Sequence, residues 1–248
     1  RIAQHLYPQS TMKIDDYIKA KLPDDHFDVA VGNPPFAGIS VSYKGAGKNS
    51  TKQSMQLHDY FFAKTLDKLK PGGVMAFVTS KGTMDKKGSS VRELLAEQAD
   101  LIGAIRLPQT AFKENAGTEV VTDIIFLRKR LEGEQPSDTA WANVKTIQAS
   151  GKPTAINEYF VNKPDMVLGE HAITSGRFGD TYTVTPNKGD FASQVNQAID
   201  KLPKDVFNPQ RGSKAEAIKV TGLDYDAASA ATKEGGVYLK GGKLMRVV

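Results

Sequence analysis

Residues 27–36 read FDVAVGNPPF, an apolar run followed directly by the tetrad Asn33-Pro34-Pro35-Phe36. The run has the length and composition of a buried β-strand. Two consecutive prolines fix φ and lack an N–H donor, so they end the strand in a rigid turn. The tetrad therefore lies at the carboxyl end of a predicted strand, where open α/β sheets bind their ligands.

Three further apolar runs of strand length follow, and helical patterns lie between them; the runs are residues 74–78, 101–105 and 120–127. A stripe of apolar residues with helical spacing, from Met55 through Phe62 and Leu66 to Leu69, precedes the second run and ends at Pro71-Gly72-Gly73. Ser90 and Glu93 form a capping-box pattern that opens the next connection.

Strands joined by helices of this length predict an α/β fold with a doubly wound, mainly parallel sheet. The link before residues 120–127 is too short for a helical crossover. We therefore expect this last run to lie antiparallel at one edge of the sheet.

The pattern changes beyond Arg130, where residues 132–138 are typical of an exposed loop. The second half predicts a helix that starts at Phe191 with Asp190 as its N-cap, and a terminal hairpin over residues 237–247. These features predict a sheet-bearing portion at residues 1–135, a smaller α+β extension at 136–212, and a linker with a hairpin at 213–248.

The composition excludes several classes of protein. The 248 residues include no cysteine and four scattered histidines, so we expect no disulfide framework and no structural metal. No run approaches the ~18 apolar residues of a membrane span, and the N-terminus has no signal pattern, so a cytoplasmic location is expected. The 33 basic residues exceed the 28 acidic ones, which permits a polyanionic partner.

The tetrad has the chemistry to bind a planar amine. The Asn33 side chain and the Pro34 carbonyl offer two fixed acceptors for the hydrogens of an NH₂ group, and the Phe36 ring can stack on the attached base. A simple turn is the alternative, and composition alone does not separate the two.

With the residues that follow it, this stretch resembles the catalytic motif of N6-adenine DNA methyltransferases. Residues 70–79, KPGGVMAFVT, are similar to the next strand of that family and its lead-in. Residues 101–108 and 117–130 are similar to the late strands of type I modification subunits. Residues 1–8 and 22–28 resemble the methylase modules of phage and plasmid methylase–helicase proteins of the antirestriction kind. The resemblance implies a methyltransferase-like sheet whose N-terminal strands are missing.

The resemblance also implies roles for individual residues. Asn33 and the Pro34 carbonyl, held by Pro35, would grip the amino group of a target adenine flipped out of double-stranded DNA, and Phe36 would stack on that base. Asp16 and Tyr17, after a strand-like segment at residues 12–15, would contact the adenine of the cofactor S-adenosyl-L-methionine. A solvated turn is the alternative for Asp16. A helicase or a recognition domain of the same parent protein is a further implied partner.

One departure from the family concerns the cofactor. No Gly-x-Gly stands before Asn33, although the family holds the methionine end of its cofactor with a glycine-rich loop. We expect a fragment, a split protein or an incomplete enzyme. Two functions stay open: a site-specific DNA adenine-N6 methyltransferase module of a modification or antirestriction protein, or a cofactor-incompetent module that binds DNA or acts as a scaffold. Protein-glutamine and RNA methyltransferases share the tetrad.

Two basic segments flank the predicted site. Residues 37–54 are expected to form a basic loop beside the tetrad, and Lys81, Lys86 and Lys87 follow the strand at residues 74–78. These lysines could contact a DNA backbone, and an ordinary solvated surface explains them equally well.

Overall fold

The computed structural model describes residues 2–45, 53–176, 179–208, 237–240 and 243–246. The chain divides into two units, and the larger one, Leu22–Gln210, contains the main sheet. The smaller unit comprises Arg1–Lys21 and Arg211–Val248, with helix α1 (Ile2–Leu6) and an antiparallel hairpin of β11 (Val237–Lys240) and β12 (Lys243–Arg246). The hairpin prediction is confirmed, whereas the predicted linker over residues 213–236 lies outside the described residues.

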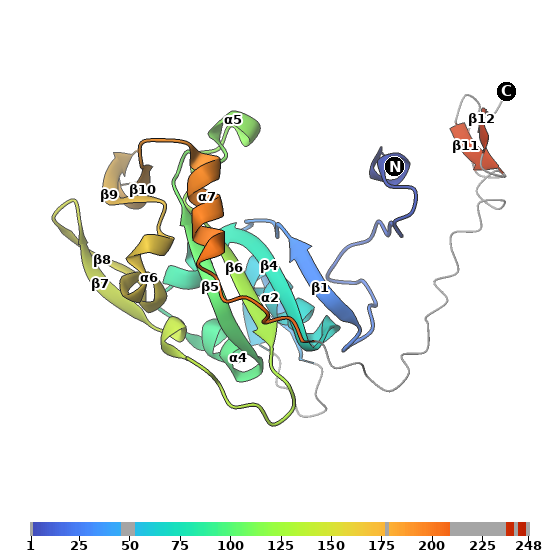
Figure 1. Ribbon diagram of the computed structural model, residues 1–248, viewed down its shortest axis with the longest axis horizontal. Coiled ribbons are helices and arrows are strands. Elements are labelled where there is room, and N and C mark those ends of the chain that lie inside the picture. Colours follow the sequence, from blue (N-terminus) through green and yellow to red (C-terminus); the bar gives the residue numbers. More distant parts are fainter. Residues whose placement is uncertain (1, 46–52, 177–178, 209–236, 241–242, 247–248) are drawn as a thin grey trace. The chain divides into compact units, whose positions relative to one another are not determined.

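The main sheet has four strands in the order β1 (Phe27–Gly32), β4 (Leu69–Ser80), β6 (Thr122–Lys129) and β5 (Ala99–Leu107) (Figure 1). β1 pairs parallel with β4, while β6 runs antiparallel to both of its neighbours. Three strands therefore share one direction, and the α/β, mainly parallel expectation is confirmed.

The prediction for residues 120–127 is right in direction and wrong in position. The chain turns back after β5 through the single-turn helix α5 (Lys113–Ala116), which makes β6 antiparallel. β6 then inserts between β4 and β5 instead of lying at an edge. Its side chains explain the central place, because Ile125 and Leu127 are 1% and 0% exposed.

Helices cover both faces of the sheet, as a doubly wound fold requires. α2 (Leu57–Lys68) and α4 (Ser90–Gln98) contact each other on one face, where the Phe62 ring lies 5.1 Å from that of Phe77. α7 (Phe191–Asp200) contacts β5, and Leu202 beyond it packs at Gly103 on the opposite face (Figure 1).

Several local predictions need correction. Met55 belongs to β3 (Gln53–Gln56) and Leu69 begins β4, so the helix between them is shorter than its stripe. The capping box is wrong because Ser90 is already helical, and the N-cap, Ser89, makes no capping hydrogen bond. The Asp190 cap is confirmed, since its carboxylate accepts from the Ser193 N–H at 2.8 Å.

The expected basic loop at residues 37–54 contains a small hairpin. β2 (Ser40–Tyr43) pairs antiparallel with β3, and residues 46–52 between them lie outside the described part. The Tyr43 hydroxyl donates to the Asp67 carboxylate at 3.0 Å, which ties the hairpin to α2. Pairing of β2 with β3 stabilises the hairpin, because it satisfies backbone N–H and C=O groups that an unpaired loop would leave to water.

Gly73 is the glycine that the sheet requires. A Cβ at this position would lie 2.9 Å from the carbonyl oxygens of Asp28 and Lys70. The β1–β4 register shifts at this level, between Phe27 and Val29, so the backbones approach too closely for a side chain. Pro71, Gly72 and Gly73 therefore lie inside β4, and they do not end the helix as predicted, because α2 already ends at Lys68.

The extension folds as an α+β region of short elements within the larger unit. It contains η1 (Ala140–Ala142), β7 (Val144–Ala149), β8 (Lys152–Asn157), α6 (Glu158–Asn162), η2 (Pro164–Met166), β9 (Gly169–Gly176) and β10 (Gly179–Pro186). β7 pairs with β8 and β9 pairs with β10, both antiparallel. The segment boundaries at 135 and 212 stay predictions, because compactness alone does not place them.

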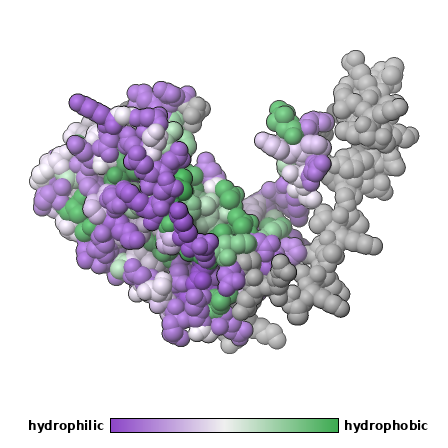
Figure 2. Space-filling view, in the orientation of Figure 1, coloured by the Kyte–Doolittle hydropathy of each residue, from purple (hydrophilic) through white to green (hydrophobic). Residues whose placement is uncertain are grey.

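The outer edge of β1 has no partner strand among the described residues. Its apolar side chains are exposed, Val29 by 51% and Val31 by 79%, and Figure 2 shows hydrophobic residues gathered over this strand. Such an edge is unusual for a strand next to a parallel partner, since parallel sheets are normally covered. Among the described residues, no helix has both the length and the apolar character needed to cross a membrane.

Candidate functional site

The tetrad Asn33–Phe36 follows β1 directly, at the carboxyl edge of the sheet. Pro34 is buried, whereas Asn33 and Pro35 are exposed and the Phe36 ring is 45% exposed. The buried proline anchors the turn and the residues on either side face solvent. This is the arrangement expected for a rigid turn that presents its neighbours to a ligand.

Both acceptors of the tetrad are free within the described part of the chain. No hydrogen bond there engages the Asn33 side chain, and no backbone N–H there donates to the Pro34 carbonyl. The Phe36 ring likewise stacks on no described ring. Asn33 and nearly half of the surface of Phe36 are exposed, so their chemistry is available to a substrate.

Asp16 and Tyr17 belong to the smaller unit, whereas the tetrad belongs to the larger one. Residues 12–15 form no strand, which corrects the expectation of a strand-like segment there. The Asp16 carboxylate accepts from the Ile18 N–H at 2.9 Å, and its carbonyl accepts from Ala20 at 2.8 Å. These local hydrogen bonds make an Asx-type turn, in which an aspartate stabilises its own backbone. The role of Asp16 and Tyr17 in cofactor binding stays a prediction.

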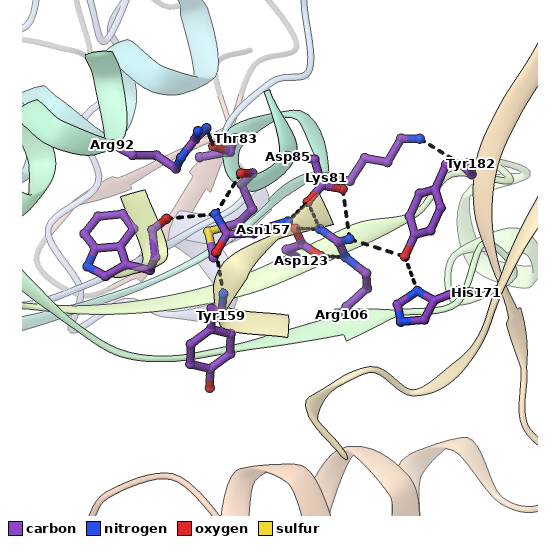
Figure 3. A network of polar contacts seen from close by, with 12 residues as sticks. Lys81, Thr83, Asp85, Arg92, Arg106, Asp123, Asn157, Tyr159, His171 and Tyr182 are labelled. Atoms are coloured by element: carbon purple, nitrogen blue, oxygen red, sulfur yellow. Dashed lines mark hydrogen bonds and ion pairs between the residues drawn. The ribbon is translucent and has the colours of Figure 1, made fainter. Parts of the chain in front are cut away.

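A buried cluster of charges lies at the same edge, where β5 ends and β6 begins (Figure 3). Arg106 and Asp123 are both 0% exposed and share two hydrogen bonds of 2.8 Å. Asp85, from helix α3 (Gly82–Asp85), lies 2.8 Å from the same guanidinium. Burial alone would lower the pKa of Arg106, but Asp123 and Asp85 raise it well above its usual value.

Two residues of the extension complete this cluster. The Tyr182 hydroxyl of β10 accepts from Arg106 at 3.3 Å and lies 2.7 Å from the His171 Nδ1 of β9. Burial raises the pKa of Tyr182 to about 12 and lowers that of His171, so both are neutral near pH 7. The guanidinium also lies 4.2 Å from the centre of the Phe160 ring.

Asn157 makes a second connection between the extension and the sheet. Its side-chain amide donates to the carbonyls of Met84 and Trp141 at 2.8 Å each, and its backbone N–H donates to Asp85 at 2.9 Å. Its side-chain oxygen caps α6 by accepting from the Tyr159 N–H at 3.0 Å. The extension is therefore a structural part of the carboxyl edge, and it determines where α3 lies.

This cluster was not among the residues predicted from the sequence. A signal was present, because Arg106 and Asp123 interrupt otherwise apolar runs that form neighbouring strands. Charged residues inside such runs are rarely buried unless they pair. No local pattern linked them to Tyr182, which lies 76 residues beyond Arg106.

Comparisons with known proteins agree with the family expected from the sequence. Residues 5–112 match the family described as Eco57I restriction-modification methylase. The chain is 34% identical over 134 residues to the defense against restriction protein B of Escherichia phage P1, covering 52% of this chain and 6% of that protein. It is 30% identical over 145 residues to the methylase subunit of the type I restriction enzyme EcoEI of Escherichia coli, covering 57% of this chain and 27% of the subunit.

A solved structure from a type I restriction–modification system is 29% identical, with a TM-score of 0.34, and the match covers 42% of this chain and 22% of that one. The chain spans about a quarter or less of the length of each of these relatives. The match to the family and the two sequence relatives confirm the resemblance to restriction–modification methylases for the part of the chain that carries β1, α2, β4 and β5.

Proposed function

We propose that this chain, a restriction–modification methylase over its matched region, is the substrate-binding part of an S-adenosyl-L-methionine-dependent DNA adenine-N6 methyltransferase. The observation that carries the proposal is the pair of free acceptors at Asn33 and Pro34, next to the exposed ring of Phe36, at the carboxyl end of β1. Relatives named as type I and type II methyltransferases support a DNA substrate.

The tetrad acts on the nucleophile. The Asn33 side-chain oxygen and the Pro34 carbonyl accept the two hydrogens of the adenine amino group, which raises the electron density on its nitrogen. Pro35 holds the turn, and Phe36 stacks on the extruded base. Because the amine attacks as a neutral nucleophile, the site needs no strong base.

The residues present fit the cofactor only in part. S-adenosyl-L-methionine supplies the methyl group in this class of enzyme, and its carboxylate and ammonium need a cradle of backbone N–H groups. The first glycine of the chain is Gly32, so no glycine-rich loop precedes the tetrad in these 248 residues. These residues can therefore bind the amine of the substrate, but they include no glycine-rich loop before the tetrad to hold the methionine end of the cofactor.

The experiment is methyl transfer by the parent protein with its Asn33→Ala variant, followed as tritiated methyl in the adenine of duplex DNA. Removing one contact to the transition state should reduce transfer about 10²–10³-fold. Asn196→Ala is the matched control, because Asn196 is an exposed asparagine on α7, on the opposite face of the sheet from α2.

Three outcomes would contradict the proposal. Full activity in Asn33→Ala would remove the tetrad from the reaction. Incorporation of the label into protein or RNA would replace the DNA substrate. An inactive parent protein, with DNA binding intact, would favour the second candidate, a scaffold module that lacks a functional cofactor site; the absence of the glycine-rich loop is the observation behind that candidate.

A further inference from the structure

A pocket of about 440 Å³ opens at the carboxyl end of β4, beside the buried cluster. Its walls come from distant parts of the chain, with Lys81 and Asp85 at α3, Lys86 and Lys87 beyond it, Gln56 before α2, and Tyr182 on β10. We call it the Lys81 pocket. The function described above makes no use of it.

Lys81, Lys86 and Lys87 form no ion pair within 4.0 Å among the described residues. Lys68, Lys70 and Lys129, by contrast, all pair with aspartates. Unpaired lysines are ordinary when they are scattered, but here three of them line one concave surface. The pocket therefore concentrates three ammonium groups that no carboxylate of the described residues contacts directly.

Asp85 is the one carboxylate that lines the pocket, and it is already matched. It pairs with Arg106 at 2.8 Å and accepts the Asn157 N–H at 2.9 Å. Four cations around the pocket interact with four carboxylates; the cations are Lys81, Lys86, Arg92 and Arg106, and the carboxylates are Asp59, Asp85, Glu93 and Asp123. Lys87 lines the pocket as a fifth cation. An anionic ligand would complete the charge balance.

Lys81 is held in place inside the pocket. Its Nζ donates to the Tyr182 carbonyl at 2.8 Å and lies 4.8 Å from the centre of the Tyr182 ring (Figure 3). Lys81 is half-buried, and this burial lowers the pKa of its ammonium. An ammonium has three N–H donors, so one fixed bond leaves donors that can point to a ligand.

The loop that carries Lys86 is fixed as well. Arg92 of α4 is 2% exposed and donates to the carbonyls of Lys86 at 2.8 Å and Thr83 at 3.2 Å. These bonds hold the backbone while the Lys86 and Lys87 side chains stay exposed. A pre-formed site of this kind loses less conformational entropy on binding than a mobile one.

The Lys81 pocket and the tetrad share one edge of the sheet. β1 ends at Gly32, which pairs with Phe77 of β4, and β4 runs on to Ser80. Four residues separate Phe77 from Lys81, and at about 3.3 Å each they place Lys81 roughly 13 Å farther along the strand direction. That separation corresponds to a few nucleotide steps of a DNA strand, whose axial rise is about 3.4 Å.

We propose that the Lys81 pocket binds a backbone phosphate of the DNA strand that carries the target base. The proposal rests on the function proposed above and extends it from the base to the backbone. Phosphate contacts fix the register and orientation of a protein on DNA, whereas the tetrad contacts the base. Lys86 and Lys87 would bind the phosphate at the rim, and Lys81 would donate from the wall.

The test measures the affinity of the full chain for a duplex DNA over a range of salt concentrations. Lys86→Ala/Lys87→Ala should bind about tenfold more weakly at low salt, and its plot of log K against log salt should be flatter by about one unit, as expected for one phosphate contact. Lys86→Arg/Lys87→Arg should restore the slope, because the positive charges are kept. Both side chains are exposed, and the Arg92 bond uses the backbone, so the fold is unaffected.

The matched control is Lys188→Ala/Lys204→Ala. These two lysines are also exposed and form no described ion pair, so the control removes the same charge away from the pocket. An equal change of slope in both double variants would overturn the proposal in favour of a diffuse surface effect. An unchanged slope in Lys86→Ala/Lys87→Ala would also overturn it, as would a loss of affinity for duplex RNA but not for DNA.

Asn33→Ala separates this proposal from the function itself. Asn33 contacts a base and no phosphate, so its loss should leave the salt slope unchanged while it abolishes methyl transfer in the parent protein. If the lysine variant kept the wild-type slope and Asn33→Ala were inactive, the phosphate site would be rejected and the methyltransferase function would be retained. If Asn33→Ala were active and the lysine variant had a flatter slope, the phosphate site would be retained and the proposed methyl-transfer role of the tetrad would be rejected.

Discussion

The Arg106 guanidinium and the Asp123 carboxylate, on adjacent strands, are joined by two hydrogen bonds of 2.8 Å with both side chains wholly buried. Asp85 and Tyr182 contact the same guanidinium. A buried arginine of this kind neutralises carboxylates that could not remain ionised alone, and it joins the extension to the sheet.

Arg106→Met should destabilise the chain by about 3–5 kcal/mol, because it leaves Asp123 buried and unpaired. Urea unfolding followed by circular dichroism measures the effect. Arg106→Met/Asp123→Asn should recover part of the loss, since it removes the stranded charge. The control is Lys113→Met, which breaks an exposed ion pair with Glu119 and should leave the unfolding midpoint in place. Equal midpoints for Arg106→Met and the wild type would contradict this account.

Asp67 gives the chain a predicted dependence on pH. It is 7% exposed, and burial raises its pKa, even though the Tyr43 hydroxyl donates to it. The folded chain thus binds this proton more tightly than the unfolded chain, whose aspartates titrate at about 4. The stability from this group is present below that pH and is lost as the pH rises through the folded pKa.

Asp67→Asn should remove this loss, because an amide oxygen still accepts from Tyr43 and carries no charge to bury. We expect the variant to be more stable than the wild type at pH 7 and to lose the advantage near pH 4. Unfolding free energies over that range provide the measurement. A variant that is less stable at pH 7 would show that the ionised carboxylate stabilises the fold.

Local sequence predicts the elements of this fold better than it predicts their neighbours. Apolar runs located β1, β4, β5 and β6, and the short link before β6 predicted its direction. The place of β6 between β4 and β5 depends on pairing over long distances, which no local period encodes. The position of the tetrad at the end of β1 was predicted correctly, because consecutive prolines end a strand through local geometry. The Arg106 cluster could not be predicted in this way, because it includes Tyr182 from a hairpin far along the chain.

The unpaired edge of β1 predicts self-association. Its backbone N–H and C=O groups on that side have no described strand partner, and Val31 is 79% exposed. Val31→Lys should reduce association, because a charged residue on an edge strand opposes pairing with a second chain. Ile14→Lys is the control, since Ile14 is 86% exposed but lies outside any strand. Sedimentation velocity would contradict this if the wild type stayed monomeric, or if both variants behaved alike.

The missing glycine-rich loop predicts weak binding of S-adenosyl-L-methionine by this chain. No glycine precedes Gly32, so the methionine end of the cofactor has no backbone cradle before the tetrad. Titration calorimetry should detect no binding at micromolar concentrations. A micromolar dissociation constant would correspond to about −8 kcal/mol and would require contacts from other residues.

Phe36 should control capture of the base with little effect on stability. Its ring is 45% exposed and meets no described ring, so Phe36→Ala removes less packing than a core substitution and should change the unfolding midpoint only slightly. Loss of stacking should cost about 1–3 kcal/mol in binding of the extruded adenine, which appears as a higher KM for DNA in the parent protein. Phe36→Tyr should be mild, because a tyrosine ring also stacks. Phe62→Ala is the contrasting variant, since Phe62 is 0% exposed and its loss should unfold the chain before it alters KM. If Phe36→Ala lowered stability as Phe62→Ala does, or left KM unchanged, the ring would be a structural part of the turn and not a surface for the base.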